Sequence, residues 1–249
     1  MKTWLKKNKY LVGAIGFGMI ALFCFFFANL NQKEEFTREA KTLLSSGLEE
    51  AKKPKKQVET KTSKTNSSKP NSSKPEVVTG EEIPVEPEET ALPTGVALSE
   101  GERPTVETLQ EAQKDFEQVK DDILGTIRIA SISLEMPILE GDSFEKMLYG
   151  ACTVLPKQTM GKGNYTLAAH NAGVDGLMFS SLGNVAVGET ITLQDRSGHG
   201  YKYKVKEQRH VNMTDTSILN LTRKPTLTLI TCDQPTKTDG RIVVIAELI

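Results

Sequence analysis

This chain has almost no net charge and few cysteines. Its 249 residues carry 31 lysines and arginines against 32 aspartates and glutamates, so the formal net charge is −1. A balance this even gives no indication of a nucleic-acid partner. Cysteine occurs at only three positions, Cys24, Cys152 and Cys232. Cys24 lies in an apolar run and is expected to act as a small hydrophobic residue. Cys152 and Cys232 would share one compartment, and an extracellular location would allow them to form a disulfide.

Charge is also missing from a stretch near the N-terminus. Residues 10–28 contain no charged side chain, and residues 1–9 include four lysines. A helix needs about 20 apolar residues to span a bilayer, and this run is longer than the apolar core of a signal peptide. We therefore expect residues 10–30 to form a transmembrane signal-anchor helix. Residues 1–9 would then be cytoplasmic and the rest of the chain would be exported. The alternative is that the segment is removed after Ala28.

Two segments of different character follow the apolar run. In residues 31–51 apolar side chains recur at spacings of three and four, which predicts a helical juxtamembrane stalk or a weakly oligomerising helix. Residues 52–104 are of low complexity, first basic and then acidic, and contain few large apolar side chains. We expect them to form a disordered charged linker. A passive tether is favoured over a basic segment that binds anionic wall or lipid phosphate.

The remaining 105–249 segment has the pattern of a folded domain that is mostly β. Residues 105–122 carry an apolar stripe with helical spacing, and from residue 123 the apolar pattern changes to a period of two. Many short strands separated by turn signals predict a small closed or partly closed barrel, preceded by one helix. The expected strands are 125–130, 133–138, 164–170, 189–194, 201–209, 226–232 and 241–248.

Three residues with chemical potential fall at the ends of these strands. Cys232 ends one strand, and Arg241 opens the next, which a tight connection makes an antiparallel neighbour. Because side chains alternate along a strand, Cys232 shares a water-tolerant face with two threonines and should look into a groove. His170 ends an earlier strand, on a face with small and polar neighbours. The neighbours on these faces are Thr226, Thr228 and Ile230 for Cys232, and Thr166 and Ala168 for His170.

A thiol, an imidazole and a guanidinium can together perform nucleophilic catalysis. The imidazole can take the proton of the thiol, or hold it as imidazolium beside a thiolate, and can then protonate a leaving amine. Arginine keeps its charge, which favours the thiolate and can stabilise an oxyanion. Each of His170 and Arg241 alone is more often a solvated residue, and His199 and His210 are expected to be surface residues. Only the combination with Cys232 indicates a site.

The same residues carry a family resemblance. Thr228-Leu229-Ile230-Thr231-Cys232 followed by Arg241 resembles the signature of sortases, the cysteine transpeptidases of Gram-positive bacterial surfaces, and Leu167-Ala168-Ala169-His170-Asn171 resembles their histidine motif. The resemblance covers residues 123–249. It implies an eight-stranded barrel, in a catalytic domain over residues 105–249 with Cys232, His170 and Arg241 as catalytic residues. An N-terminal anchor with no apolar C-terminal span resembles the housekeeping class A.

The resemblance further implies a substrate and a reaction. Sortases of this class cleave Leu-Pro-any-Thr-Gly sorting signals between Thr and Gly, form a thioester, and transfer the surface protein to an amine of the peptidoglycan precursor. The enzyme would be anchored in the cell membrane with its catalytic domain outside. The expected substrate-binding residues are Ala168 and Ile230, on the groove faces, and Thr216, Ile218, Leu219 and Thr231.

No cofactor or metal is expected. Some class A members bind calcium, but the loop 155–163 contains no acidic residue and Leu221 stands where a second acidic ligand would lie. Two other functions remain open at this point. One is a non-catalytic surface β-domain with a Cys152–Cys232 disulfide, and the other is a cysteine hydrolase.

Overall fold

The computed structural model describes residues 9–54 and 103–249. The expected cytoplasmic segment 1–9 and the expected linker 52–104 therefore lie almost entirely outside the described residues. The long helices are α2 (Lys9–Ala51) and α3 (Val106–Val119). The strands are β1 (Ile123–Ile129), β2 (Leu134–Leu139), β3 (Ala151–Thr153), β4 (Asn164–Ala168), β5 (Thr190–Asp195), β6 (Gly200–Asn212), β7 (Thr226–Cys232) and β8 (Gly240–Leu248). Short 3-10 helices are η1 (Lys120–Asp122), η2 (Ala130–Ile132), η3 (Lys146–Leu148), η4 (Leu182–Asn184) and η5 (Thr216–Leu219).

The eight strands close into one barrel. Their order is β1-β2-β3-β4-β7-β8-β6-β5, and β5 pairs with β1 to complete the circle. The pairs β2–β3 and β4–β7 are parallel, and all the other pairs are antiparallel. The prediction of a small, mostly-β barrel with eight strands is thereby confirmed. The sequence pattern did not predict β3, because three residues are too few to show an alternation.

Strand β7 is buried on both faces. Leu227 and Leu229 are fully buried, as the alternation predicts. The opposite face, which we expected to meet water, is buried as well, so that part of the prediction is wrong. Its hydroxyl groups are satisfied inside the protein, since Thr228 Oγ1 donates to Asn164 Oδ1 at 2.7 Å. Buried polar groups that find such partners do not need water.

Helix α3 begins at a side-chain cap. Thr105 accepts a hydrogen bond from the backbone N–H of Thr108, and the Thr108 hydroxyl bonds the backbone N–H of Thr105 in return. The two residues satisfy backbone groups that would otherwise be unpaired at the start of a helix. Leu109 and Ala112 turn into the core. The Tyr149 hydroxyl donates to the Ala112 carbonyl at 2.8 Å, which attaches α3 to the segment between β2 and β3.

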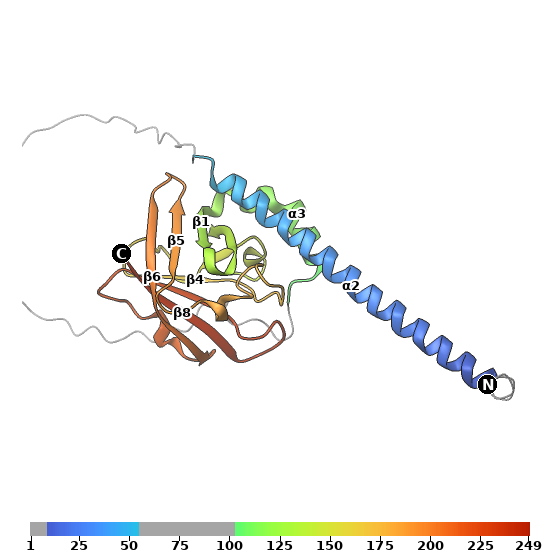
Figure 1. Ribbon diagram of the computed structural model, residues 1–249. Helices are drawn as coiled ribbons and strands as arrows, with labels where there is room; N and C mark the ends of the chain where they lie inside the picture. The colour runs from blue at the N-terminus through green and yellow to red at the C-terminus, as the bar shows by residue number, and fades with distance from the viewer. Residues whose placement is uncertain (1–8, 55–102) are drawn as a thin grey trace, which may run out of the picture. The chain divides into compact units, whose positions relative to one another are not determined.

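The second half of α2 packs on the barrel and on α3. Figure 1 shows α3 lying alongside this half of the long helix. The apolar stripe that predicted a helical segment over residues 31–51 is buried against these elements. Gly47 makes the approach to β2 possible, because a Cβ at this position would lie 2.5 Å from Pro137 Cγ. The buried residues of the stripe are Ala40, Leu43, Leu44 and Ala51.

The first half of α2 coincides with the expected membrane segment, residues 10–30. The side chains of residues 9–18, 21 and 22 are outside the described part of the chain. Within the part that is described, no helix combines the length and the apolar character required to cross a membrane. The exposed large apolar side chains on this half are Met19, Ile20, Phe23, Phe25, Phe26, Phe27 and Leu30.

Candidate active site

Cys232 and Arg241 face each other across two neighbouring strands. Cys232 is the last residue of β7, and the antiparallel register pairs it directly with Arg241 on β8. Residues that are directly opposite in an antiparallel pair project on the same side of the sheet. The predicted neighbourhood of the thiol and the guanidinium is therefore present in the structure.

His170 comes to the same place from the other side of β7. Strand β4 runs parallel to β7, with Ala168 paired to Ile230, and the alignment continues past the strand end because Ala169 N–H donates to the Ile230 carbonyl at 3.2 Å. Asn171 Nδ2 then donates to the Cys232 carbonyl at 3.0 Å. Two residues beyond Ala168, the His170 side chain falls on the side of the sheet that carries Cys232. Cys232 thus lies between the strand that presents His170 and the strand that presents Arg241.

These three side chains are almost inaccessible to solvent. Cys232 is 6 % exposed, and His170 and Arg241 are each 3 % exposed. The prediction that Cys232 looks into an open groove is wrong for this structure. Phe144 is one physical reason, because its ring packs edge-on against the His170 ring with the ring centres 4.7 Å apart. Nε2 of His170 also donates to the Phe144 carbonyl at 3.2 Å, which leaves Nδ1 as the basic nitrogen.

Burial favours the uncharged forms of both the imidazole and the thiol. It lowers the pKa of His170 to about 4, against the opposing effects of the Phe144 carbonyl and Glu145. It raises the pKa of Cys232, although the positive charge of Arg241 acts in the opposite direction. Both shifts follow from the cost of placing a charge away from water. At neutral pH the closed site therefore holds a thiol and a neutral imidazole.

The guanidinium of Arg241 is held by the β7–β8 connection. Its Nη1 donates to the carbonyls of Thr238, at 3.0 Å, and Gly240, at 2.9 Å. The connection is in turn closed by Asp233, which accepts from Thr238 Oγ1 at 2.6 Å and is bonded to His210 Nε2 at 2.8 Å. A Cβ at Gly240 would overlap the Asp233 carboxylate, so glycine is needed for this close approach. These contacts orient Arg241 before any substrate binds.

Comparison with known proteins identifies the family of this site. A family model described as the sortase domain matches residues 127–249. Sortase A of Listeria monocytogenes is 36 % identical over 129 residues, which are 52 % of this chain and 58 % of the relative. Sortase A of Bacillus anthracis is 34 % identical over 154 residues, which are 62 % of this chain and 71 % of the relative. The chain belongs to the sortase family. Sortases are cysteine transpeptidases, and relatives that are named sortase A support class A.

A solved sortase has the same fold. The crystal structure of Listeria monocytogenes sortase A aligns with a TM-score of 0.50 at 34 % sequence identity, over 52 % of this chain and 88 % of that one. The alignment with the curated relative from the same organism spans only 58 % of the relative's length, less than two thirds. The domain that carries Cys232 and Arg241 is within the matched region.

The expected substrate-binding residues of this sortase fall into two groups. Ala168 and Ile230 are buried neighbours on the face that carries Cys232. In η5, Ile218 is buried, Leu219 is half-buried and Thr216 is exposed. Asn164 Nδ2, at the start of β4, holds η5 through the carbonyls of Ile218, at 2.9 Å, and Asn220, at 3.1 Å.

Thr231 differs from the other expected substrate contacts. It alternates with Cys232 and Ile230, so its side chain projects on the opposite face of β7. Its hydroxyl is 2.9 Å from the Ala169 carbonyl, to which it donates. Thr231 therefore fastens the end of the strand that carries His170, and its side chain does not share the face of Cys232.

The structure contradicts the proposed disulfide of the alternative hypothesis. Cys152 and Cys232 are both free and buried. Cys152 lies on β3 opposite Ala168 of β4, so a complete strand separates it from β7. Burial raises the pKa of the Cys152 thiol, which keeps it protonated and unreactive. The non-catalytic domain stabilised by a Cys152–Cys232 bridge is thus excluded.

Three residues that contact the site residues were not predicted from the sequence. Asn171 directly follows His170, and that adjacency was the one available signal for its contact with the Cys232 backbone. Thr238 and Phe144 lie in irregular segments where no periodicity applies. Phe144 precedes His170 by 26 residues and reaches it only through the folding of the β2–β3 connection.

The buried His170 predicts a stability that falls in acid. With a folded pKa of about 4 and an ordinary value of 6.5, the unfolded state binds a proton first as the pH falls. The free energy of unfolding should therefore decrease between pH 6.5 and pH 4, by on the order of 3 kcal/mol from this residue. Urea unfolding of the wild type and of His170→Gln across this range measures the difference, and the slope should be smaller in the variant. The exposed His199→Gln is the matched control and should keep the wild-type slope. Equal slopes in all three proteins would contradict the prediction.

Proposed function

We propose that this protein is a membrane-anchored transpeptidase that cleaves Leu-Pro-any-Thr-Gly sorting signals between Thr and Gly. It then transfers the surface protein to an amine of the peptidoglycan precursor. The observation that carries the proposal is the register that pairs Cys232 with Arg241 and keeps the end of β4, with His170, on the other side of β7. This arrangement supplies a nucleophile, a proton carrier and a fixed positive charge at one end of the barrel.

The reaction proceeds through two acyl transfers. His170 takes the proton of the Cys232 thiol, and the sulfur attacks the threonine carbonyl carbon. The oxyanion that forms faces the guanidinium of Arg241. The C–N bond then breaks as His170 returns the proton to the glycine nitrogen, which leaves a thioester on Cys232. An acceptor amine attacks the thioester and gives its proton to His170. As the new amide forms, the sulfur leaves as a thiolate and takes this proton back from His170, which restores the thiol.

Substrate entry requires the β2–β3 connection, which carries Phe144, to move. His170 and Cys232 are nearly inaccessible, and a peptide can approach the imidazole only when the Phe144 ring moves away from it. Hydration of the site would then raise the pKa of His170 from its buried value, because the desolvation that lowers it is relieved. Ala168, Ile218, Leu219 and Ile230 are the apolar residues that support binding of the Leu-Pro part of the signal, with Thr216 at the edge of η5.

We further infer that the first half of α2 anchors the protein in the cell membrane. The uncharged run of residues 10–28 supports this, and so do the exposed apolar side chains between Met19 and Leu30. The lysines before the run support a cytoplasmic N-terminus and an external catalytic domain. The partners of such an enzyme are surface proteins with a C-terminal sorting signal and the peptidoglycan precursor.

A fluorogenic Leu-Pro-any-Thr-Gly peptide tests this function. The full chain in detergent micelles, under reducing conditions, should cleave the peptide, and an added glycine-type amine should yield the transfer product at the expense of the hydrolysis product. Product masses separate the two outcomes. Cleavage with no amine incorporation would identify a cysteine hydrolase instead. No cleavage at all would refute the enzymatic proposal.

A further inference from the structure

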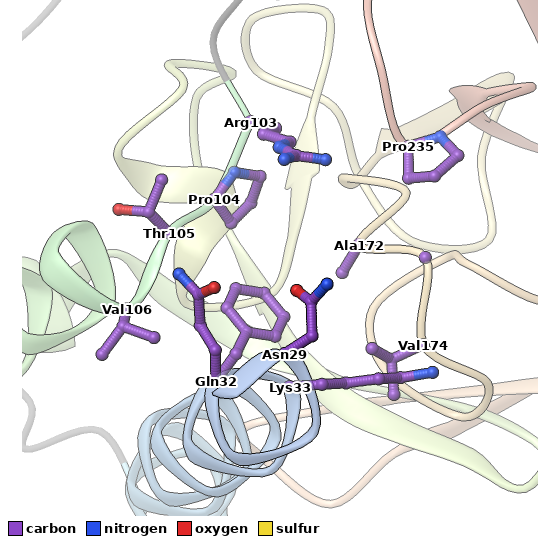
Figure 2. A pocket seen from close by; sticks show the side chains of 12 residues that line it. Asn29, Gln32, Lys33, Arg103, Pro104, Thr105, Val106, Ala172, Val174 and Pro235 are labelled. Carbon is purple, nitrogen blue, oxygen red and sulfur yellow. The ribbon is translucent and has the colours of Figure 1, made fainter. Parts of the chain in front are cut away.

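A cavity lies where the long helix meets the loops next to Cys232. Its volume is about 340 Å³, and its walls come from α2, from the residues that lead into α3, from the loop after His170 and from the β7–β8 connection. Figure 2 shows Asn29 and Gln32 rising from α2 on one side, Arg103 on another, and Pro235 with Ala172 across from them. A volume of this size is at the lower end of the range for small-ligand pockets.

The polar lining of this cavity is positively charged. Lys33 and Arg103 both line it, together with the side-chain amides of Asn29 and Gln32, and none of the described lining residues is acidic. Within residues 9–54 and 103–249, neither cation has a carboxylate partner in an ion pair. A group of hydrogen-bond donors that includes two positive charges suits an anion that offers several oxygen atoms. A phosphate or diphosphate fits this description.

Two segments that line the cavity continue directly from residues of the active site. Asn171 donates to the Cys232 carbonyl, and its Oδ1 accepts from the backbone N–H of Gly173 in the cavity wall at 3.0 Å. Pro235 follows Cys232 by three residues and packs so closely on Gly173 that a Cβ there would lie 3.0 Å from Pro235 Cβ. A molecule held in the cavity by one end is thus adjacent to the segments that carry His170 and Cys232.

The position along α2 indicates where the anion comes from. Asn29, Gln32 and Lys33 lie at the end of the exposed apolar stretch, with Asn29 directly before Leu30 and the other two shortly after it. If that stretch is inserted in a bilayer, as proposed above, these polar residues emerge at the depth of the lipid headgroups. A phosphate attached to a lipid would meet the cavity at this level.

We propose that the cavity binds the phosphate group of a lipid-linked amine acceptor and thereby presents the amine to the thioester on Cys232. The proposal rests on the proposed transpeptidase function and assigns its second substrate a site of its own. Lys33 and Arg103 bind the phosphate oxygens, and Asn29 and Gln32 complete the set of donors. The chemistry that distinguishes this acceptor from a simple amine is its phosphate.

Two acceptors that differ only in phosphate test the proposal. One is an amine joined to a prenyl chain through a diphosphate, and the other carries the same amine and chain through an uncharged linker, both in phosphatidylcholine vesicles with the full chain. For the wild type, the KM of the diphosphate acceptor should be about tenfold lower. Lys33→Gln with Arg103→Gln should remove the difference. Lys41→Gln with Lys114→Gln, which removes the same charge from exposed positions of α2 and α3, should retain it.

Each other outcome overturns a defined part of the inference. Equal KM values for the two acceptors in the wild type would refute the phosphate site. Loss of the difference on adding phosphatidylglycerol vesicles without acceptor would assign the cavity to ordinary lipid headgroups, against the proposal. Direct titration of Cys232→Ala in micelles with a short, water-soluble prenyl diphosphate measures binding without turnover. Binding that Lys33→Gln with Arg103→Gln abolishes would support the site even if peptide cleavage failed, and absence of binding would refute it even if cleavage succeeded.

Discussion

Replacing Cys232 by alanine is expected to abolish thioester formation and to lower peptide cleavage by at least about 10⁴-fold, the scale on which removal of a catalytic nucleophile acts. No other described thiol can substitute, because Cys152 is on β3, fully buried, with burial raising its pKa, and Cys24 is on α2. Intact-protein mass spectrometry after mixing with the peptide should show an acyl adduct on the wild type and none on the variant.

The matched control for this experiment is Cys152→Ala. This variant removes a buried sulfur of the same size from the same barrel, so it reports any effect of packing without touching the site. Its cleavage rate should remain within a few-fold of the wild type at a temperature where both are folded. An acyl adduct on Cys232→Ala would show that Cys232 is not the nucleophile. A loss of cleavage in Cys152→Ala equal to that in Cys232→Ala would assign both losses to packing and would remove the kinetic support for Cys232 as the nucleophile.

Replacing Arg241 by lysine is expected to reduce kcat by about 10²–10³-fold, the usual cost of losing one oxyanion donor, with a smaller effect on KM. Lysine keeps the positive charge opposite Cys232. It lacks the planar group through which Arg241 is held by the carbonyls of Thr238 and Gly240, and a flexible ammonium would not be fixed toward the carbonyl that reacts. Steady-state kinetics on the fluorogenic peptide measure the separate changes in kcat and KM.

Replacing Arg241 by glutamine tests the effect of its charge on the pKa of the Cys232 thiol. Because the guanidinium opposes the effect of burial on Cys232, its removal should raise the pKa of that thiol further. The pH at which iodoacetamide alkylates Cys232 should therefore shift upward in Arg241→Gln. Arg209→Lys, on the exposed part of β6 and paired with Glu207, is the control and should leave kcat unchanged. A wild-type kcat in Arg241→Lys would remove Arg241 from the catalytic step.

Much of the barrel was predictable because most of its strands are long enough to alternate. The strand 226–232 matches the structure in both bounds, and 241–248 differs from β8 by one residue. Strand β3 has only three residues, and its pairing with β2 and β4 is a long-range contact that leaves no local pattern. The helical stripe of residues 31–51 was visible in the sequence. The surface on which this stripe packs was not visible in the sequence, because the contact with Pro137 depends on how the chain folds back.

In the site, too, the features that depend on neighbouring residues were predicted, and those that depend on distant residues were not. Alternation placed Cys232 and Arg241 on one face, since that depends only on strand pairing and on the short connection between the strands. Accessibility was predicted wrongly, because it depends on Phe144, which belongs to a different part of the chain and covers His170. The directions of the pKa shifts of His170 and Cys232 follow from this burial and could not be predicted from the sequence either.

The sequence by itself determined the residue chemistry, the faces of the strands and the family. All of these depend on residue identity and on spacing within a few positions, which the chain carries locally. The tertiary structure alone decided that Cys152 and Cys232 stay apart, that burial favours the uncharged forms of the imidazole and the thiol, and that α2 helps to form a cationic cavity near the loop after His170. Those properties arise from contacts between segments far apart in the chain, and desolvation and packing act only once these segments are brought together.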